Sequence, residues 1–261
     1  MLLRRALWEA RRTLPGWAVA IVGIGLMYAA FWPSMRTPAM SAALAAYPQD
    51  VLAAFNMSDL TSAAGYLGST VYGLMAPLLV AVFAITWGAR TVAGDEDAGT
   101  LDLILAHPVS RLRLALQRFA ALVAGLVAVG AVLLAAMLAV RGPVELAEVP
   151  VAGLVAINLQ LVLLGVCLGA VAFAAGAATG SRAVAVGTGS VVAVLAYLAN
   201  SVLPMVDGLA WTRNASVFHW YLGGSPLLTG VRWGGVAALV VTTLVLVTAG
   251  TVVFTRRDLK A

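Results

Sequence analysis

Charged residues are scarce in this chain, and their scarcity excludes most soluble architectures. Asp, Glu, Lys and Arg make up only 10% of its 261 residues, whereas 62% are hydrophobic. A typical soluble domain carries about 25% charged residues, and the mean hydropathy here is +0.99. Repeated apolar runs of about 20 residues indicate several membrane-spanning helices rather than one large core. The runs do not alternate in polarity, which argues against a spanning β-barrel.

Residues that commonly carry catalysis are also rare. Cys167 is the only cysteine, so no disulfide can form within the chain. Lys260 is the only lysine and no GxxxxGK[ST] sequence occurs, so the chain cannot build a Walker-type phosphate cradle by itself. His107 and His219 fall on opposite sides of the membrane in the topology predicted below and cannot form a metal pair. We therefore expect a non-catalytic chain that binds no cofactor or metal.

The apolar runs themselves lack acidic residues. Proton- and sodium-coupled carriers place ionisable groups near the middle of the membrane, so their absence argues against an autonomous secondary carrier. Ser190 has no histidine within a span, which argues against an intramembrane protease. Mild polar side chains within spans favour hydrogen bonds between helices. Four of them are also candidates for lining a pathway: Asn158, Gln160, Tyr197 and Asn200.

Six spans follow from the long apolar runs. They are predicted at about 14–32, 68–88, 119–140, 151–175, 183–203 and 233–254. No repeat, low-complexity segment or soluble domain interrupts them. We therefore predict an all-α membrane protein with a single transmembrane domain over residues 1–261.

Basic residues set the orientation of these spans. Twelve Lys and Arg side chains lie on the side of both termini, and four lie on the other side. The positive-inside rule therefore predicts that both termini are cytoplasmic. The same explanation accounts for the formal charge of +5 without nucleic acid as a partner. A composition rich in Ala, Val and Arg suggests a GC-rich bacterial source, and hence the bacterial cytoplasmic membrane.

The first 13 residues form a basic, partly apolar segment. Leu3, Ala6, Leu7 and Ala10 recur at helical spacing, and Trp8 suits the level of the lipid headgroups. We predict an amphipathic helix over 1–13 that lies on the inner leaflet. A disordered basic tail is the alternative. Because the run that follows is long enough to span, we expect a retained first helix rather than a cleaved signal peptide.

Two long outer loops join the predicted spans, at 33–66 and 204–232. The second contains aromatic residues that suit the outer membrane interface or a re-entrant hairpin: Trp211, Phe218, Trp220 and Tyr221. The residues alone leave both placements open for 204–232.

The connector between the second and third spans, residues 88–118, is the most polar stretch of the chain. Asp95 can cap a helix whose first turn holds Glu96 and Asp97, where acidic groups complement the helix dipole. Gly99 and Thr100 interrupt that element.

A short apolar patch follows in the same connector. Leu101, Ile104 and Leu105 lie at positions i, i+3 and i+4 of a helix. Pro108 disfavours helix at the preceding residue, and Ser110 can cap the helix that enters the third span. The pattern predicts a short, half-apolar helix presented to the cytoplasm, where a soluble partner can meet it. A surface helix resting on the bilayer is the alternative.

The segment GDEDAGTLDLILAHPVSR, residues 94–111, resembles the coupling helix of type-2 ABC exporter permeases. Weaker matches are Tyr47-Pro48, the run 218–221 and the run 254–259. The resemblance covers essentially the whole chain. It implies six spans, an N-terminal interfacial helix, a cytoplasmic coupling helix between spans two and three, and an outer re-entrant hairpin.

The resemblance also implies partners. Two membrane subunits, identical or different, would work with two ATPase subunits, which hold the ATP and Mg²⁺. The expected ATPase contacts lie within the connector: Asp95, Glu96, Asp97, Gly99, Thr100, Leu101, Ile104, Leu105 and Pro108. A membrane scaffold or sensor that recruits a cytosolic partner is the alternative function, followed by a secondary carrier or channel.

Overall fold

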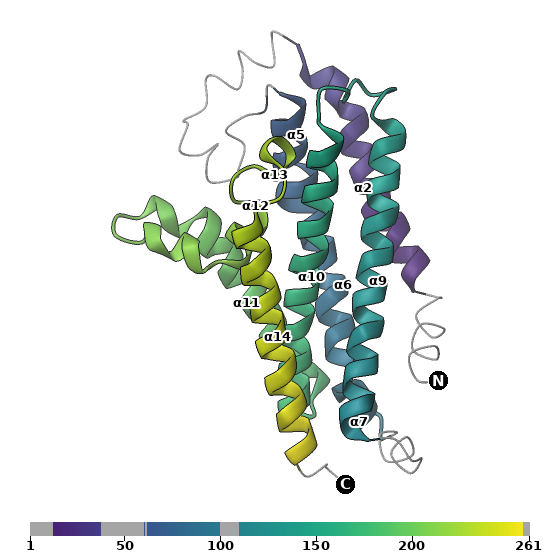
Figure 1. Cartoon of the computed structure of the whole chain (residues 1–261), viewed down its shortest axis with the longest axis vertical. Helices are drawn as coiled ribbons and strands as arrows, with labels where there is room; N and C mark the ends of the chain where they lie inside the picture. The colour runs from purple at the N-terminus through teal and green to yellow at the C-terminus, as the bar shows by residue number, and fades with distance from the viewer. Residues whose placement is uncertain (1–12, 38–59, 61, 100–109, 258–261) are drawn as a thin grey trace.

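The computed structural model describes residues 13–37, 60, 62–99 and 110–257, and within these ranges all regular structure is helical. Six of the helices are long and apolar enough to cross a membrane (Figure 1). The predicted interfacial helix, apart from Thr13, lies outside the described residues. The same holds for the part of the connector from Thr100 to Pro108.

The six spans confirm the predicted number and order. The first is α2 (Leu14–Met35), and the second combines α5 (Ala63–Ser69), the π-helical turn η1 (Val71–Met75) and α6 (Ala76–Arg90). The others are α9 (Arg111–Val140), α10 (Val151–Thr179), α11 (Arg182–Ser201) and α14 (Trp233–Arg256).

Five short elements connect these spans. They are α7 (Ala93–Asp97) after the second span, then η2 (Leu203–Met205), η3 (Ala210–Ala215), α12 (Val217–Leu222) and α13 (Pro226–Thr229) between α11 and α14.

The third span begins earlier than the apolar run indicates, at Arg111 rather than near 119. The Ser110 hydroxyl accepts a hydrogen bond from the Arg113 N–H at 3.3 Å, so the predicted cap is confirmed. With 30 residues, α9 is about 45 Å long, which exceeds a hydrocarbon core of about 30 Å. Its basic first turns therefore extend beyond the apolar layer.

Helix α10 is the centre of the bundle. Its most apolar stretch is 67% buried, against 11% for α11 and 17% for α14. Figure 1 shows α10 between α14 on one side and α6 and α9 on the other. The backbones of α6 and α10 approach each other closely at Gly88, where an added Cβ would overlap the carbonyl group of Gly169.

We call the two ends of the bundle the terminal end and the opposite end. The terminal end holds α7, the start of α9, the α10–α11 link and the end of α14, and the opposite end holds α12, α13 and the α9–α10 loop (Figure 1). Helix α11 leans away from the bundle toward the opposite end, and η2 and η3 extend it sideways. Its exposed face is apolar, with Val191, Val194 and Leu195.

Candidate functional site

Helix α7 carries Asp95, Glu96 and Asp97 of the connector, and it begins two residues before Asp95. Its N-terminal flanking residue is Val92, so the prediction that Asp95 caps this helix is wrong. Val92 and Ala93 are buried, and their packing fixes the start of the helix. Asp95 and Glu96 lie in the first turn, and the helix ends before Gly99, as the sequence indicates.

Asp95 and Glu96 form ion pairs with distant parts of the chain. Asp95 pairs with Arg118 on α9, and Arg118 also donates to the Thr91 carbonyl at 3.1 Å. Glu96 pairs with Arg257, directly after α14. The Glu96 side chain is only 4% exposed and that of Arg257 17%, so this pair is largely withdrawn from water.

Asp97 contacts a third helix. Its Oδ2 accepts a hydrogen bond from the Arg182 N–H at 2.8 Å, at the first residue of α11. The link before α11 turns at Gly180 with φ +69°, and a Cβ there would overlap the Glu96 carboxylate. Glycine at this position therefore leaves room for the acid to reach its partner.

We call these six residues the α7 cluster: Asp95, Glu96, Asp97, Arg118, Arg182 and Arg257. Arg111 strengthens the arrangement, because its guanidinium donates to the Arg257 carbonyl at 2.7 Å. One five-residue helix thus connects the cytoplasmic-side ends predicted for α9, α11 and α14. The acids were predicted from their position in the connector. Their partners were not, because the arginines are distant in sequence; the predicted topology places opposite charges at one end without pairing them.

The polar candidates inside the spans lie mainly in contacts between helices. Asn158 is 3% exposed, and its amide donates to the Tyr72 hydroxyl at 2.9 Å. Gln160 is fully buried; its amide donates to the Tyr221 carbonyl at 2.5 Å and accepts from the Arg232 N–H at 3.1 Å. One side chain of α10 thereby holds both ends of the segment that runs from the end of α12 to the start of α14.

Helix α11 carries the other two pathway candidates, Tyr197 and Asn200. The Tyr197 ring packs edge-on against Phe218, with ring centroids 5.6 Å apart. Asn200 donates to the neighbouring Ser201 hydroxyl at 3.3 Å. Each of the four candidates makes a contact within the chain, and a pathway role for them stays a prediction.

A wide helical turn explains why Tyr72 is a contact point. In η1 the Ala76 N–H bonds to the Val71 carbonyl, five residues back. The next bond of that kind would join the Tyr72 carbonyl to residue 77, but Pro77 has no N–H. The Tyr221 hydroxyl donates to the Tyr72 carbonyl instead, at 2.9 Å. A buried backbone acceptor left open by proline is thus satisfied from α12.

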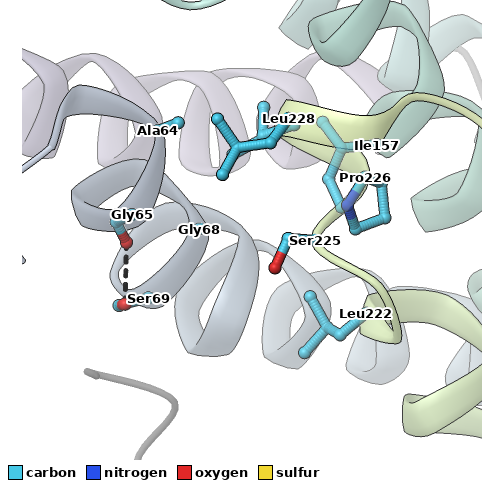
Figure 2. A pocket seen from close by; sticks show the side chains of 10 residues that line it. Ala64, Gly65, Gly68, Ser69, Ile157, Leu222, Ser225, Pro226 and Leu228 are labelled. Atoms are coloured by element: carbon cyan, nitrogen blue, oxygen red, sulfur yellow. Dashed lines mark hydrogen bonds between the residues drawn. The ribbon is translucent and has the colours of Figure 1, made fainter. Parts of the chain in front are cut away.

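A small cavity lies near this contact, between α5, α10 and α13. Figure 2 shows Gly65 and Ser69 of α5 on one side, Ile157 of α10 above, and Ser225 and Pro226 facing them. Its volume is about 90 Å³, whereas ligand sites usually hold at least about 300 Å³. Within the described residues, no cluster of three or more His, Cys, Asp or Glu side chains could hold a metal ion.

Comparison with known families agrees with this architecture. The profile described as "ABC-2 family transporter protein" matches residues 6–259, nearly the whole chain. The chain belongs to the ABC-2 transporter family. A search of curated proteins finds no significant match.

Membership of the ABC-2 family gives the six spans a context. The chain is a multi-pass transmembrane permease subunit of an ABC transporter. Membrane proteins of this family work with ABC ATPase subunits and are generally non-catalytic themselves. Helix α7, which carries the three acids of the cluster, lies in the connector 88–118, whose segment 94–111 resembles the coupling helix of such permeases.

Proposed function

We propose that this ABC-2 subunit is an export permease driven by a separate ATPase through the connector 88–118. The observation that carries the proposal is the α7 cluster. Asp95, Glu96 and Asp97 contact the ends of α9, α14 and α11, respectively. A displacement applied to the connector is therefore carried to three spans at once, as a coupling element requires.

The division of roles within the connector follows from these contacts. The three acids are engaged within the chain, so we assign them, with Gly99, to positioning the element. Leu101, Ile104 and Leu105, with Thr100 and Pro108, then provide the surface for the ATPase. An apolar patch suits burial in a groove of the partner. ATP and Mg²⁺ are held by that partner, and closure of two ATPase subunits supplies the binding energy that shifts the permease between conformations.

The proposed assembly contains two permease subunits, identical or different, in the bacterial cytoplasmic membrane. The terminal end faces the cytoplasm, because twelve of sixteen basic residues were assigned to that side. The exposed apolar face of α11 supports contact with lipid or with the second subunit. The segment 204–232 is proposed to be re-entrant on the outer side, and residues 1–13 to lie on the inner leaflet.

Leu101→Asp tests the coupling role. We expect normal amounts of the variant in the membrane but loss of the co-purifying ATPase chain and of at least about 90% of transport-linked ATPase activity, because a buried charge without a partner opposes docking. The measurement is a pull-down from native membranes with partner masses and ATP hydrolysis read together.

Leu112→Asp is the matched control. Leu112 is half exposed in the first turn of α9 at the same end, where an acidic group is favourable. This variant should retain its partner and activity. Normal ATPase association and hydrolysis with Leu101→Asp would show the coupling assignment to be wrong, and a wild-type chain that purifies alone would favour the scaffold alternative.

A further inference from the structure

A cavity of about 540 Å³ lies at the terminal end, between the start of α2, the end of α6, α7 and the first turns of α9. This volume is within the range of about 300–1,000 Å³ that is usual for small-molecule sites. The residues that give it its character are Trp17, Trp87, Arg90, Asp95, Arg118 and Arg182.

The cavity is positively charged. Arg118 and Asp95 pair with each other and neutralise one charge of each sign. Arg90 and Arg182 are exposed, and within the described ranges no carboxylate forms an ion pair with either guanidinium. Two guanidinium groups on one cavity favour an anion with several oxygens, because each presents a planar fork of N–H donors to it.

The other wall of the cavity is aromatic. Trp17 of α2 packs against Phe83 of α6 with ring centroids 5.4 Å apart, and Phe83 packs edge-on against Trp87 at 5.2 Å. Tryptophan is enriched at the level where lipid headgroups meet acyl chains. The cavity therefore joins a cationic edge, at the last residue of α6 and the first residue of α11, to an aromatic wall within the spans. A charged edge next to an aromatic, apolar wall suits the headgroup and acyl chains of a phospholipid better than it suits a soluble anion.

We propose that this cavity binds the headgroup of an anionic phospholipid from the leaflet at the terminal end. The guanidinium groups of Arg90 and Arg182 are the partners of the phosphate, and the acyl chains lie along Trp17 and Trp87. Basic cavities between spans on the cytoplasmic side are known to bind such headgroups. Because the site adjoins the α7 cluster through Asp95 and Arg118, the bound lipid contacts the base of the connector. The proposal does not depend on ATPase coupling.

Native mass spectrometry of the full-length chain in detergent tests this assignment. Phosphatidylglycerol and phosphatidylcholine with the same acyl chains are titrated separately, and bound lipid is counted on the intact protein. We expect the wild type to prefer phosphatidylglycerol. Arg90→Gln/Arg182→Gln should weaken phosphatidylglycerol binding roughly 30-fold, since each basic residue near an anionic lipid contributes about a factor of five. Binding of phosphatidylcholine should change little.

Two further variants make the test specific. Arg113→Gln/Arg256→Gln removes two exposed arginines from the same end, outside the cavity, and should leave the lipid preference within about twofold of the wild type. Arg90→Lys/Arg182→Lys keeps the positive charge, on which the attraction to an anionic lipid depends, and should retain most of the binding. Gel filtration shows whether each variant is folded, and the lysine variant supplies the test if the glutamine variant is not.

Three results would overturn the proposal. Unchanged phosphatidylglycerol binding in Arg90→Gln/Arg182→Gln would place the lipid elsewhere. An equal loss of phosphatidylglycerol binding in Arg113→Gln/Arg256→Gln would show that the preference comes from general surface charge and not from the cavity. Displacement of the lipid by excess inorganic phosphate would identify a site for a soluble anion instead.

Discussion

The helix α7 at the terminal end and the helix α12 at the opposite end are held to the bundle by different kinds of interaction. At the terminal end, ion pairs join α7 to α9 and to the end of α14. At the opposite end, neutral hydrogen bonds from Gln160 and Tyr221 hold α12 and the start of α14 to α10 and to the second span. Neutral buried bonds are insensitive to salt and to most changes of pH. Ion pairs at a polar boundary respond to nearby charge, so a docking protein can change the contacts of α7 at the terminal end.

Among the substitutions that test this difference between the two ends, Glu96→Gln should lower the free energy of unfolding most. The buried pair loses one charge and leaves Arg257 without its partner, so we expect the free energy of unfolding to fall by about 3 kcal/mol. The measurement is unfolding of the purified chain by a denaturing detergent.

The control for Glu96→Gln is Glu145→Gln. Glu145 pairs with Arg36 at the opposite end, but the two side chains are 61% and 44% exposed. We expect a loss of at most about 1 kcal/mol, as for most surface ion pairs. Equal losses in the two variants would contradict the distinction between a buried and an exposed pair.

Gln160→Leu should have the next largest effect. It removes both bonds of a fully buried amide and leaves the Tyr221 carbonyl and the Arg232 N–H unpaired, at a cost of about 2 kcal/mol. We expect the loss to be the same at low and high salt. Asn200→Leu is the control, since among the described residues the Asn200 side chain bonds only to Ser201 next to it, and it should cost less than about 0.5 kcal/mol. If the loss of stability with Gln160→Leu were smaller at high salt than at low salt, the contact would not be a neutral one.

The smallest predicted effect is a pH dependence of folding stability, which arises from His219 at the opposite end. Burial, with Arg213 and Arg232 nearby, lowers the pKa of His219 below its usual value of 6.5. The unfolded chain therefore binds this proton first, so stability is complete above pH 6.5 and falls as the pH drops through the folded-state pKa. His219→Gln should remove that part of the acid sensitivity, which thermal unfolding between pH 7.5 and 5 would detect. An unchanged pH profile would exclude His219 as the source.

The spans were predictable because long apolar runs specify them locally. The α7 cluster was predictable only in part, since Arg257 is 161 residues from Glu96 and the pairing depends on how the helices pack. Asp95 was assigned to a cap because capping preferences are local, whereas the burial of Val92 and Ala93 set the true start of α7. Gln160 could not be assigned to a contact or a pathway from the sequence, because no local pattern says which face of α10 meets α12.

The wide turn at η1 also divides the second span into two parts that face different directions. Each residue of an α-helix advances about 100° around the axis, and a π turn contains one residue more than the regular turn it replaces. The buried faces of α5 and α6 are therefore offset by about 100° relative to an unbroken helix. Deleting one residue between Val71 and Met75 would realign them, so that either Tyr66 in α5 or Phe83 in α6 would turn away from its present neighbours. The second span is thus two differently oriented helices, each matched to its own end of the bundle.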